Sequence, residues 1–439
     1  MTQLSERRNV RQALEGLALF QDVFDDPIGR AVRGLVAEPT YNSAARLVAL
    51  LAEEAELYPE QMVGDAWQNH LLDRVLASQN AFSRKAERDG PSSIGEGLRR
   101  QVLRELRMLQ DIYSQGGKAL ALEAYSVLGD NSGAAWSDFQ PLGRGPALHR
   151  AEAVAFKQTL STSSDWPGLI DQLATIYATV GTGDFARYRA FRWVRDGAKS
   201  RLQGVAYPDP IRLENLFGYE RERDPIIRNA ERFAAGLPGN NALIYGERGT
   251  GKSSTVKALL NAFEDRGLRM IEMAKEDLGD FPEIADIVRE RRERFVVFVD
   301  DLSFDEHETY YKALKVALEG SIEARPENLV FYATSNRRHL VQEHFSDRQS
   351  DDGDVHSFES WDEKLSLSDR FGIRVWFGAP DQDRFLQIVD GIAGRQPNLR
   401  LSHDELQRRA LLWAEQNNGR SGRTARQFMD ALVGELALP

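Results

Sequence analysis

The sequence predicts an α/β protein with three parts: an all-helical N-terminal region, a three-layer core around a parallel sheet, and a small C-terminal helical lid. Two observations support this fold class. Up to about residue 200, apolar residues recur at three- and four-residue spacing, which is the pattern of amphipathic helices. From about residue 211, short apolar runs alternate with helical segments, as in parallel sheets joined by crossover helices. We therefore expect domains at residues 1–203, 211–380 and 381–439.

The N-terminal region is expected to be helical, with breaks rich in Gly, Ser and Pro at 89–93 and 129–146. It contains no fixed-period repeat, so a solenoid is not supported. The expected helical segments are 44–57, 66–84, 98–113, 119–128 and 151–160.

A proline-punctuated linker at 203–210 leads into the core, where strand-sized apolar runs begin. Parallel sheets bind ligands at the carboxyl ends of their strands, so functional residues are expected directly after these runs. The expected strands are 242–245, 268–273, 295–299, 329–333 and 373–377. The lid is expected to contain only helices, at 383–392, 403–415 and 424–436.

The composition argues against a membrane-spanning or secreted protein and excludes sites that depend on cysteine. The chain has 439 residues, 42% of them hydrophobic, and no apolar run long enough to span a membrane. The N-terminus lacks the uninterrupted apolar stretch of a signal peptide, so we expect a cytoplasmic protein with no membrane partner. The absence of cysteine excludes disulfides, thiolate catalysis and cysteine metal sites. The net charge of −11 argues against broad attachment to DNA or anionic membranes.

Residues 246–253 form a complete G-x-x-x-x-G-K-S phosphate loop. The loop lies between an apolar strand and a helical pattern, which is the context that this motif requires. Its glycines allow backbone N–H groups to surround phosphate oxygens, and the helix N-terminus adds a positive dipole. Lys252 is expected to reach the β- and γ-phosphates, and the Ser253 hydroxyl to bind Mg²⁺. The expected nucleotide-binding residues are Gly246, Gly249, Thr250, Gly251, Lys252, Ser253 and Ser254.

Two acids follow the buried strand 295–299. Mg²⁺ on a triphosphate needs a carboxylate at the tip of a neighbouring strand, and Asp300 takes that position. Asp301 would orient or deprotonate the attacking water, although an Asp there can also cap a helix. The expected metal is therefore Mg²⁺, held by Ser253 and Asp300. A guanine-binding N-K-x-D motif is absent after the fourth strand, which excludes a GTPase.

Three further polar residues are candidates for catalysis. Asn336 follows the strand 329–333 and could bind the attacking water or the γ-phosphate, or serve as an ordinary turn residue. Arg370 precedes the strand 373–377, where a surface salt bridge with Asp369 is the alternative. Arg423 is one of three arginines near the start of the last helix, for which a solvated helix face is the alternative.

Taken in order, these motifs resemble the AAA+ ATPase module. The Asp-Asp ending of its Walker B motif resembles the replication-initiator and helicase-loader branch. Segments 300–304, 332–340 and 363–372 resemble more closely a bacterial ATPase family catalogued as domain of unknown function 815. The corresponding motifs are Walker A at 246–253, Walker B at 295–301, sensor 1 at Asn336, an arginine finger at 369–371, and sensor 2 at Arg423, with Arg426 as second choice.

The resemblance implies that ATP binds between the core and the lid, and that Asp301, Asn336, Arg370 and Arg423 act in its hydrolysis. Arg370 would reach the γ-phosphate of a neighbouring subunit, so the resemblance also implies a homo-oligomer. The acidic segment 347–362 is longer than such modules usually have before the finger, and it is a candidate insertion or partner site.

We therefore expect an ATP-hydrolysing remodeller or loader that acts on a protein or nucleic-acid client. The alternative is a nucleotide-controlled switch or scaffold with slow hydrolysis; a small-molecule kinase is a weaker third option. Segment 186–201 interleaves arginines with Tyr188, Phe191 and Trp193, a pattern that could bind nucleic acid. Because the chain is acidic, a packed linker helix is the favoured interpretation, and nucleic acid is the less favoured partner.

Overall fold

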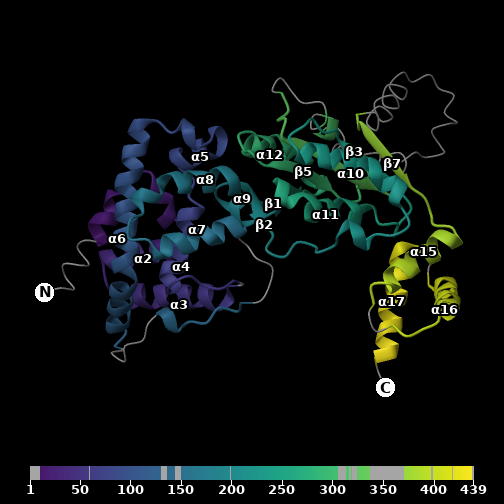
Figure 1. Ribbon diagram of the computed structural model, residues 1–439, viewed down its shortest axis with the longest axis horizontal. Coiled ribbons are helices and arrows are strands. Elements are labelled where there is room, and N and C mark those ends of the chain that lie inside the picture. The colour runs from purple at the N-terminus through teal and green to yellow at the C-terminus, as the bar shows by residue number, and fades with distance from the viewer. Residues whose placement is uncertain are drawn as a thin grey trace. The chain divides into compact units, whose positions relative to one another are not determined.

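A computed structural model divides the chain into two compact units, Met1–Tyr188 and Arg189–Pro439 (Figure 1). The expected fold class is confirmed, because a helical unit precedes a seven-stranded, mostly parallel sheet. The acidic segment 347–362 and Asp369 lie outside the described residues. The structure describes residues 10–58, 60–129, 136–143, 150–197, 199–304, 313–315, 318, 324–336, 370–396, 399–417 and 419–437.

Side-chain caps determine where several helices of the N-terminal unit begin. The Asn80 side chain accepts hydrogen bonds from the N–H groups of Phe82 and Ser83, which starts a new helix there. The expected segment 66–84 is therefore two helices rather than one. The α-helices of this unit are α2 (Pro27–Ala37), α3 (Tyr41–Leu57), α4 (Ala66–Leu76), α5 (Ala81–Asp89), α6 (Glu96–Val127), α7 (Ala151–Thr162), α8 (Ile170–Val180) and α9 (Asp184–Arg187).

The expected segments 98–113 and 119–128 form one continuous helix, α6, of 32 residues. Gly117 allows α6 to approach Asp65 closely, because a Cβ at Gly117 would lie 2.6 Å from Asp65 Oδ2. Even this long helix is too polar for a bilayer, and no helix in the described residues has the length and hydropathy needed to cross a membrane.

The core of the N-terminal unit combines aromatic side chains with paired charges. Trp67, Trp166 and Tyr177 are fully buried. Lys157 Nζ lies 2.6 Å from Asp73 Oδ1, and both side chains are buried. A buried charge is tolerated in a folded protein when it is paired in this way.

The sheet of the C-terminal unit has the strand order β2-β1-β4-β5-β6-β3-β7, in which only β1 and β2 are antiparallel. Helices α10 (Glu220–Ala234), α11 (Lys252–Phe263) and α12 (Phe281–Val288) lie between its strands in the chain. All five expected strands are present. The strands are β1 (Ala190–Asp196), β2 (Lys199–Gly204), β3 (Ala242–Gly246), β4 (Leu268–Glu272), β5 (Arg294–Val299), β6 (Leu329–Ser335) and β7 (Ile373–Phe377).

The interpretation of segment 186–201 as a linker helix is wrong, because most of it forms the hairpin of β1 and β2. Phe191 and Trp193 point into the core, whereas Arg192 and Arg195 face solvent and pair with acids. Arg195 bonds both carboxylate oxygens of its partner, Asp280, at 2.9 and 2.6 Å. The predicted domain boundary at residue 203 therefore moves to Tyr188, since the hairpin belongs to the sheet.

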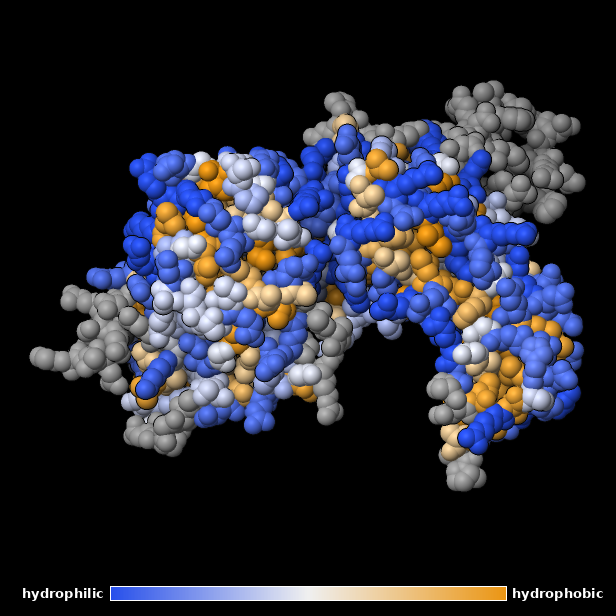
Figure 2. Space-filling view, in the orientation of Figure 1, coloured by the Kyte–Doolittle hydropathy of each residue, from blue (hydrophilic) through white to orange (hydrophobic). Residues whose placement is uncertain are grey.

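The lid consists of α15 (Gln382–Ala393), α16 (His403–Gln416) and α17 (Gly422–Ala437), as expected. Ala410, Phe428 and Met429 are buried in the same core cluster as the sheet strands. Figure 2 shows apolar residues at the surface of the lid, where Leu412 on α16 and Leu436 on α17 are 45% and 47% exposed. The lid is thus joined to the sheet through a shared apolar core.

Candidate nucleotide-binding site

A cavity of about 750 Å³ lies in the C-terminal unit, where the carboxyl ends of the sheet strands meet the lid. Its walls come from the phosphate loop, the residues after β5 and β6, the segment before α10, and helices α15 and α17. This volume is within the range of small-molecule sites. Parallel sheets bind ligands at the carboxyl ends of their strands, because the loops that follow the strands converge there.

The phosphate loop connects β3 to α11, and its glycines adopt conformations that other residues avoid. The φ angles of Gly246, Gly249 and Gly251 are 136°, 76° and 91°. A Cβ at Gly246 would lie 2.0 Å from the carbonyl oxygen of Phe377 on the neighbouring strand β7, so no side chain fits. The loop therefore turns sharply beside β7 and directs the N-terminus of α11 toward the cavity.

Two hydroxyl residues of the loop have different positions. Thr250 is buried, and its hydroxyl donates a hydrogen bond to the carbonyl oxygen of Glu247 at 2.8 Å. Ser254 lies in the first turn of α11 and lines the cavity. Thr250 thus stabilises the shape of the loop, and both residues line the cavity.

The Lys252 ammonium is buried within the loop. Its Nζ donates to the carbonyl oxygens of Gly246 at 2.9 Å and Glu247 at 2.7 Å, and to Asn336 Oδ1 at 3.0 Å. Burial lowers the pKa of Lys252, and the charges of the two strand-end acids oppose this shift. All three acceptors are neutral, and a charged phosphate oxygen would form a stronger hydrogen bond with this ammonium.

Asp300 follows β5 and contacts the phosphate loop directly. Its Oδ1 accepts hydrogen bonds from the Ser253 hydroxyl at 2.5 Å, from the Thr334 hydroxyl, and from the Asp301 N–H at 3.1 Å. Ser253 and Asp300 provide oxygen ligands, the type that Mg²⁺ prefers. The described residues contain no group of three His, Cys, Asp or Glu that could hold a metal. The pair thus fits an ion that takes its other ligands from phosphate and water.

Asp301 is the only non-glycine residue with a positive φ in the described chain, at 53°. Such a conformation costs about 1–3 kcal/mol and is concentrated at functional sites. The Asp301 carboxylate accepts a hydrogen bond from Asn336 Nδ2 at 2.6 Å. Asn336 bonds Lys252 through its other amide atom, so it links the lysine of the phosphate loop to the acid expected to activate water.

The start of α17 contacts the phosphate loop. The Arg423 N–H donates to the carbonyl oxygen of Gly249 at 3.1 Å. A Cβ at Gly249 would lie 2.9 Å from Ser421 Oγ, so the contact requires glycine there. Arg423 and Arg426 both line the cavity, which leaves both candidates for a role at the phosphates.

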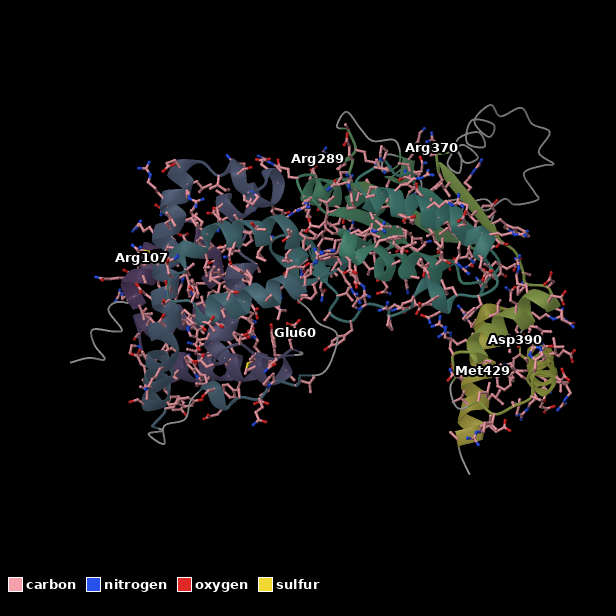
Figure 3. All side chains as sticks on the ribbon, in the orientation of Figure 1. Glu60, Arg107, Arg289, Arg370, Asp390 and Met429 are labelled. Carbon is pink, nitrogen blue, oxygen red and sulfur yellow. The ribbon has the colours of Figure 1, made fainter. Side chains whose placement is uncertain are left out.

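Arg370 is not among the residues that line this cavity. It lies at the amino end of β7, as Figure 3 shows. The phosphate loop follows the carboxyl end of the parallel strand β3, where Gly246 pairs with Phe377. The chain from Arg370 to Phe377 spans about 23 Å when extended. Arg370 therefore lies at the amino ends of these strands, whereas the cavity lies at their carboxyl ends.

Some cavity residues were not predicted from the sequence. Arg223 lies on α10, Arg248 occupies a variable position of the phosphate loop, Lys257 lies on α11, and Thr334 is near the end of β6. Thr334 could have been found by alignment of the parallel strands, since Val299 pairs with Ala333. The charged side chains that line the cavity are six cations, Arg223, Arg248, Lys252, Lys257, Arg423 and Arg426, and two acids, Asp300 and Asp301.

Comparisons with known proteins place most of the C-terminal unit in a family. The family described as "Protein of unknown function (DUF815)" matches residues 186–436. The structure of the FIGL-1 AAA domain in complex with ADP is 18% identical over 49% of this chain and 70% of its own, with a TM-score of 0.32. The Thermotoga maritima RuvB Holliday junction branch migration motor is 14% identical over 51% of this chain and 72% of its own, with a TM-score of 0.33.

Structural likeness at these scores carries no argument about activity. A search of curated proteins found no match. Any function must therefore be supported by the residues of the site itself.

Proposed function

The chain belongs to the family described as "Protein of unknown function (DUF815)", and we propose that it is an AAA+ ATPase that binds ATP with Mg²⁺ and hydrolyses it as a homo-oligomer. One observation carries the proposal. Six cationic and two acidic side chains line a single cavity beside a phosphate loop, and the two acids contact Ser253 and Asn336, respectively. An excess of cations around helix and loop N–H groups favours a polyanion such as a triphosphate.

Each side chain has a role that its contacts support. Lys252 and the N–H groups of the loop bind the β- and γ-phosphates, and Ser253 with Asp300 holds Mg²⁺. When bound, Mg²⁺ neutralises charge that develops on the phosphate oxygens. Asp301 orients the attacking water or accepts its proton, and Asn336 fixes the position of the Asp301 carboxylate at 2.6 Å.

The same proposal includes an assembly in which Arg370 acts on the nucleotide of a neighbouring subunit. Arg370 lies at the amino end of β7, and its own subunit's cavity lies at the carboxyl ends of the strands. An arginine at the amino end of β7 can contribute to hydrolysis only in the cavity of another copy of the chain. A head-to-tail contact of this kind generates a ring or a filament.

A nucleotide-controlled switch or scaffold with slow hydrolysis is the alternative. The observation that favours it concerns Asp301, whose Oδ1 is already bonded to Asn336. The side chain of Asp301 is also one methylene shorter than the glutamate that many ATPases have at this position, so its carboxylate reaches less far toward a water molecule. A water molecule would then have to approach the other carboxylate oxygen, so turnover could be slow even though nucleotide binds.

We propose a protein client, with the N-terminal unit as the region that recognises it, and a cytoplasmic location. A nucleic-acid client is less favoured because Phe191 and Trp193 are 1% and 4% exposed and cannot stack on bases. The intervening Arg192 is already paired with Glu272 at 3.1 Å. Segment 186–201 therefore offers little of what a nucleic-acid strand needs.

Phosphate release from ATP tests the proposal. We expect steady hydrolysis by the wild-type chain, and a loss of about 100- to 10,000-fold in Asp301→Asn with ATP affinity retained. Asp286→Asn, on the exposed side of α12, is the matched control and should leave the rate unchanged. Equal, slow rates in the wild type and Asp301→Asn would support the switch instead. Absence of ATP binding in the wild type would contradict both.

A further inference from the structure

Thr334 connects the two acids of the site. It is 1% exposed and lies on β6, between β3 of the phosphate loop and β5 of the acids. Its hydroxyl donates to Asp300 Oδ1 and accepts the Asp301 N–H at 3.0 Å. Its carbonyl oxygen accepts the Leu302 N–H at 2.7 Å. One residue thus binds a side chain and two consecutive backbone N–H groups across the strand ends.

These contacts hold the backbone of Asp301, the residue of the site with a strained conformation. The Asp301 N–H and the Leu302 N–H lie on either side of the Asp301 Cα, and both donate to Thr334. With both peptide groups fixed, Asp301 is held at its φ of 53°, which a residue with a side chain otherwise avoids. In this conformation its carboxylate meets Asn336 Nδ2.

The Thr334 hydroxyl also orients the metal-binding acid. Asp300 Oδ1 receives three hydrogen bonds, from Ser253, Thr334 and Asp301. A carboxylate with one oxygen fixed by three donors cannot rotate freely. Its other oxygen, Oδ2, is therefore oriented without any movement at the moment of reaction.

We propose that Thr334 is a positioning residue that holds Asp300 and Asp301 in the geometry required for hydrolysis. It acts through the two acids and does not itself contact the reacting atoms. A valine at this position keeps the size of the side chain but lacks the hydroxyl, whereas serine keeps the hydroxyl. The expected loss of ATP turnover in Thr334→Val rests on the proposed ATPase function, whereas the expected change in the backbone of Asp301 does not.

The kinetic test compares Thr334→Val with Thr334→Ser. In Thr334→Val we expect kcat for ATP to fall about 100-fold, with little change in KM, because Asp301 is misplaced while the phosphate loop is intact. The affinity for Mn²⁺ in the presence of ATP, measured by electron paramagnetic resonance, should also fall. Thr334→Ser should restore most of both. Thr182→Val, which also removes the hydroxyl of a buried threonine but in the N-terminal unit, should change neither.

A crystal structure of Thr334→Val separates failure of this inference from failure of the proposed function. We expect Asp301 to leave positive φ and its contact with Asn336 to be lost, whether or not the wild-type chain hydrolyses ATP. An Asp301 that keeps its φ and its contact with Asn336 would overturn the inference, as would wild-type kcat and Mn²⁺ affinity in Thr334→Val.

Discussion

Charged side chains cluster in both units of this protein, but the balance between cations and acids differs. In the N-terminal unit, His70 is 3% exposed and lies between Glu54 at 2.7 Å and Asp26 at 3.3 Å. Lys157 and Asp73 form a second buried pair there. At the cavity of the C-terminal unit, six cations meet only two acids.

The difference separates charges that stabilise a fold from charges that bind a ligand. The buried pairs of the N-terminal unit are internally neutralised, so their removal should cost stability and leave nucleotide affinity unchanged. Of the six cavity cations, Arg223 is buried and pairs with Glu220 at 3.1 Å, but the other five still outnumber the two acids. Removal of these five should therefore cost binding or turnover and little stability. Four predictions are given in decreasing order of expected effect. The first concerns Arg370, a cation outside its own subunit's cavity, and the other three test the comparison directly.

The largest effect is expected for Arg370→Ala. ATP should still bind, whereas hydrolysis should fall by roughly three to five powers of ten, which is the range for loss of an arginine supplied by a neighbouring subunit. Arg374→Ala on β7, exposed four residues later in the chain, is the matched control. Phosphate release and ATP titration measure the two quantities.

Mixing two inactive variants tests whether Arg370 acts between subunits. Lys252→Ala should not bind ATP but still carries Arg370, and Arg370→Ala binds ATP without the arginine. A mixture should recover part of the wild-type rate at mixed interfaces. A mixture as inactive as its components, or normal turnover by Arg370→Ala alone, would contradict an arginine supplied in trans.

The second effect is on stability. Asp73→Asn should destabilise the N-terminal unit by about 3–5 kcal/mol, because Lys157 is left charged and buried without its partner. Asp171→Asn is the matched control, since Asp171 contacts Arg99 at 2.6 Å but is 68% exposed. It should cost less than about 1 kcal/mol. Urea unfolding of both variants measures the difference, and similar losses would show that burial is not the deciding factor.

The third effect depends on pH through His70. Burial alone would lower its pKa, but the hydrogen bonds and charges of Asp26 and Glu54 outweigh burial and raise it to about 9. Because the folded-state pKa lies above the unfolded value of 6.5, this stabilisation is complete below pH 6.5 and is lost as the pH rises through about 9. The loss amounts to about 3 kcal/mol.

Unfolding of the wild type and of His70→Gln between pH 6 and pH 10 checks the His70 prediction. The variant should lack the loss of stability in this window. His403→Gln, an exposed histidine of the lid that faces Asp390, should behave like the wild type. Asp26 has the opposite dependence on pH. Burial alone would raise its pKa, but His70 and the Gly29 N–H lower it to about 2. Its contribution to the stability of the fold is therefore lost as the pH falls through about 2.

The smallest effect is expected for Arg423→Ala. Loss of one of six cavity cations should weaken ATP binding about tenfold, or about 1.4 kcal/mol, because five cations remain. Arg420→Ala is the control, since Arg420 lies three residues earlier, outside the cavity lining, and contacts Gln382. Calorimetric titration of ATP into both variants checks this. A tenfold loss in Arg420→Ala would point to a general effect of surface charge.

Much of the C-terminal unit could be predicted because its signals are local in sequence. The phosphate loop specifies its own turn through glycines, and the strands of the parallel sheet are short apolar runs with clear ends. Asp300, Asp301 and Asn336 could be predicted because each follows directly from such a strand. Their roles in hydrolysis stay predictions.

The features that were missed depend on contacts between distant segments. Strand β1 has alternating buried aromatics and exposed arginines, a period of two, but the acidity of the whole chain favoured the interpretation of this segment as a packed linker helix. Thr334 was missed because it is recognised as a site residue only once β5 and β6 are aligned, which places it beside Asp300. The position of Arg370 at the end of the strands opposite the cavity follows from the parallel direction of β3 and β7.

Calorimetric titration of ATP with Mg²⁺ into the full chain tests the central claim most directly. The excess of cations around the cavity predicts one site per chain, binding that is lost in Lys252→Ala, and binding that is unchanged in Lys118→Ala, an exposed lysine on α6. Absence of binding to the wild-type chain, or equal affinities of the wild type and Lys252→Ala, would contradict the assignment of this cavity as a nucleotide site.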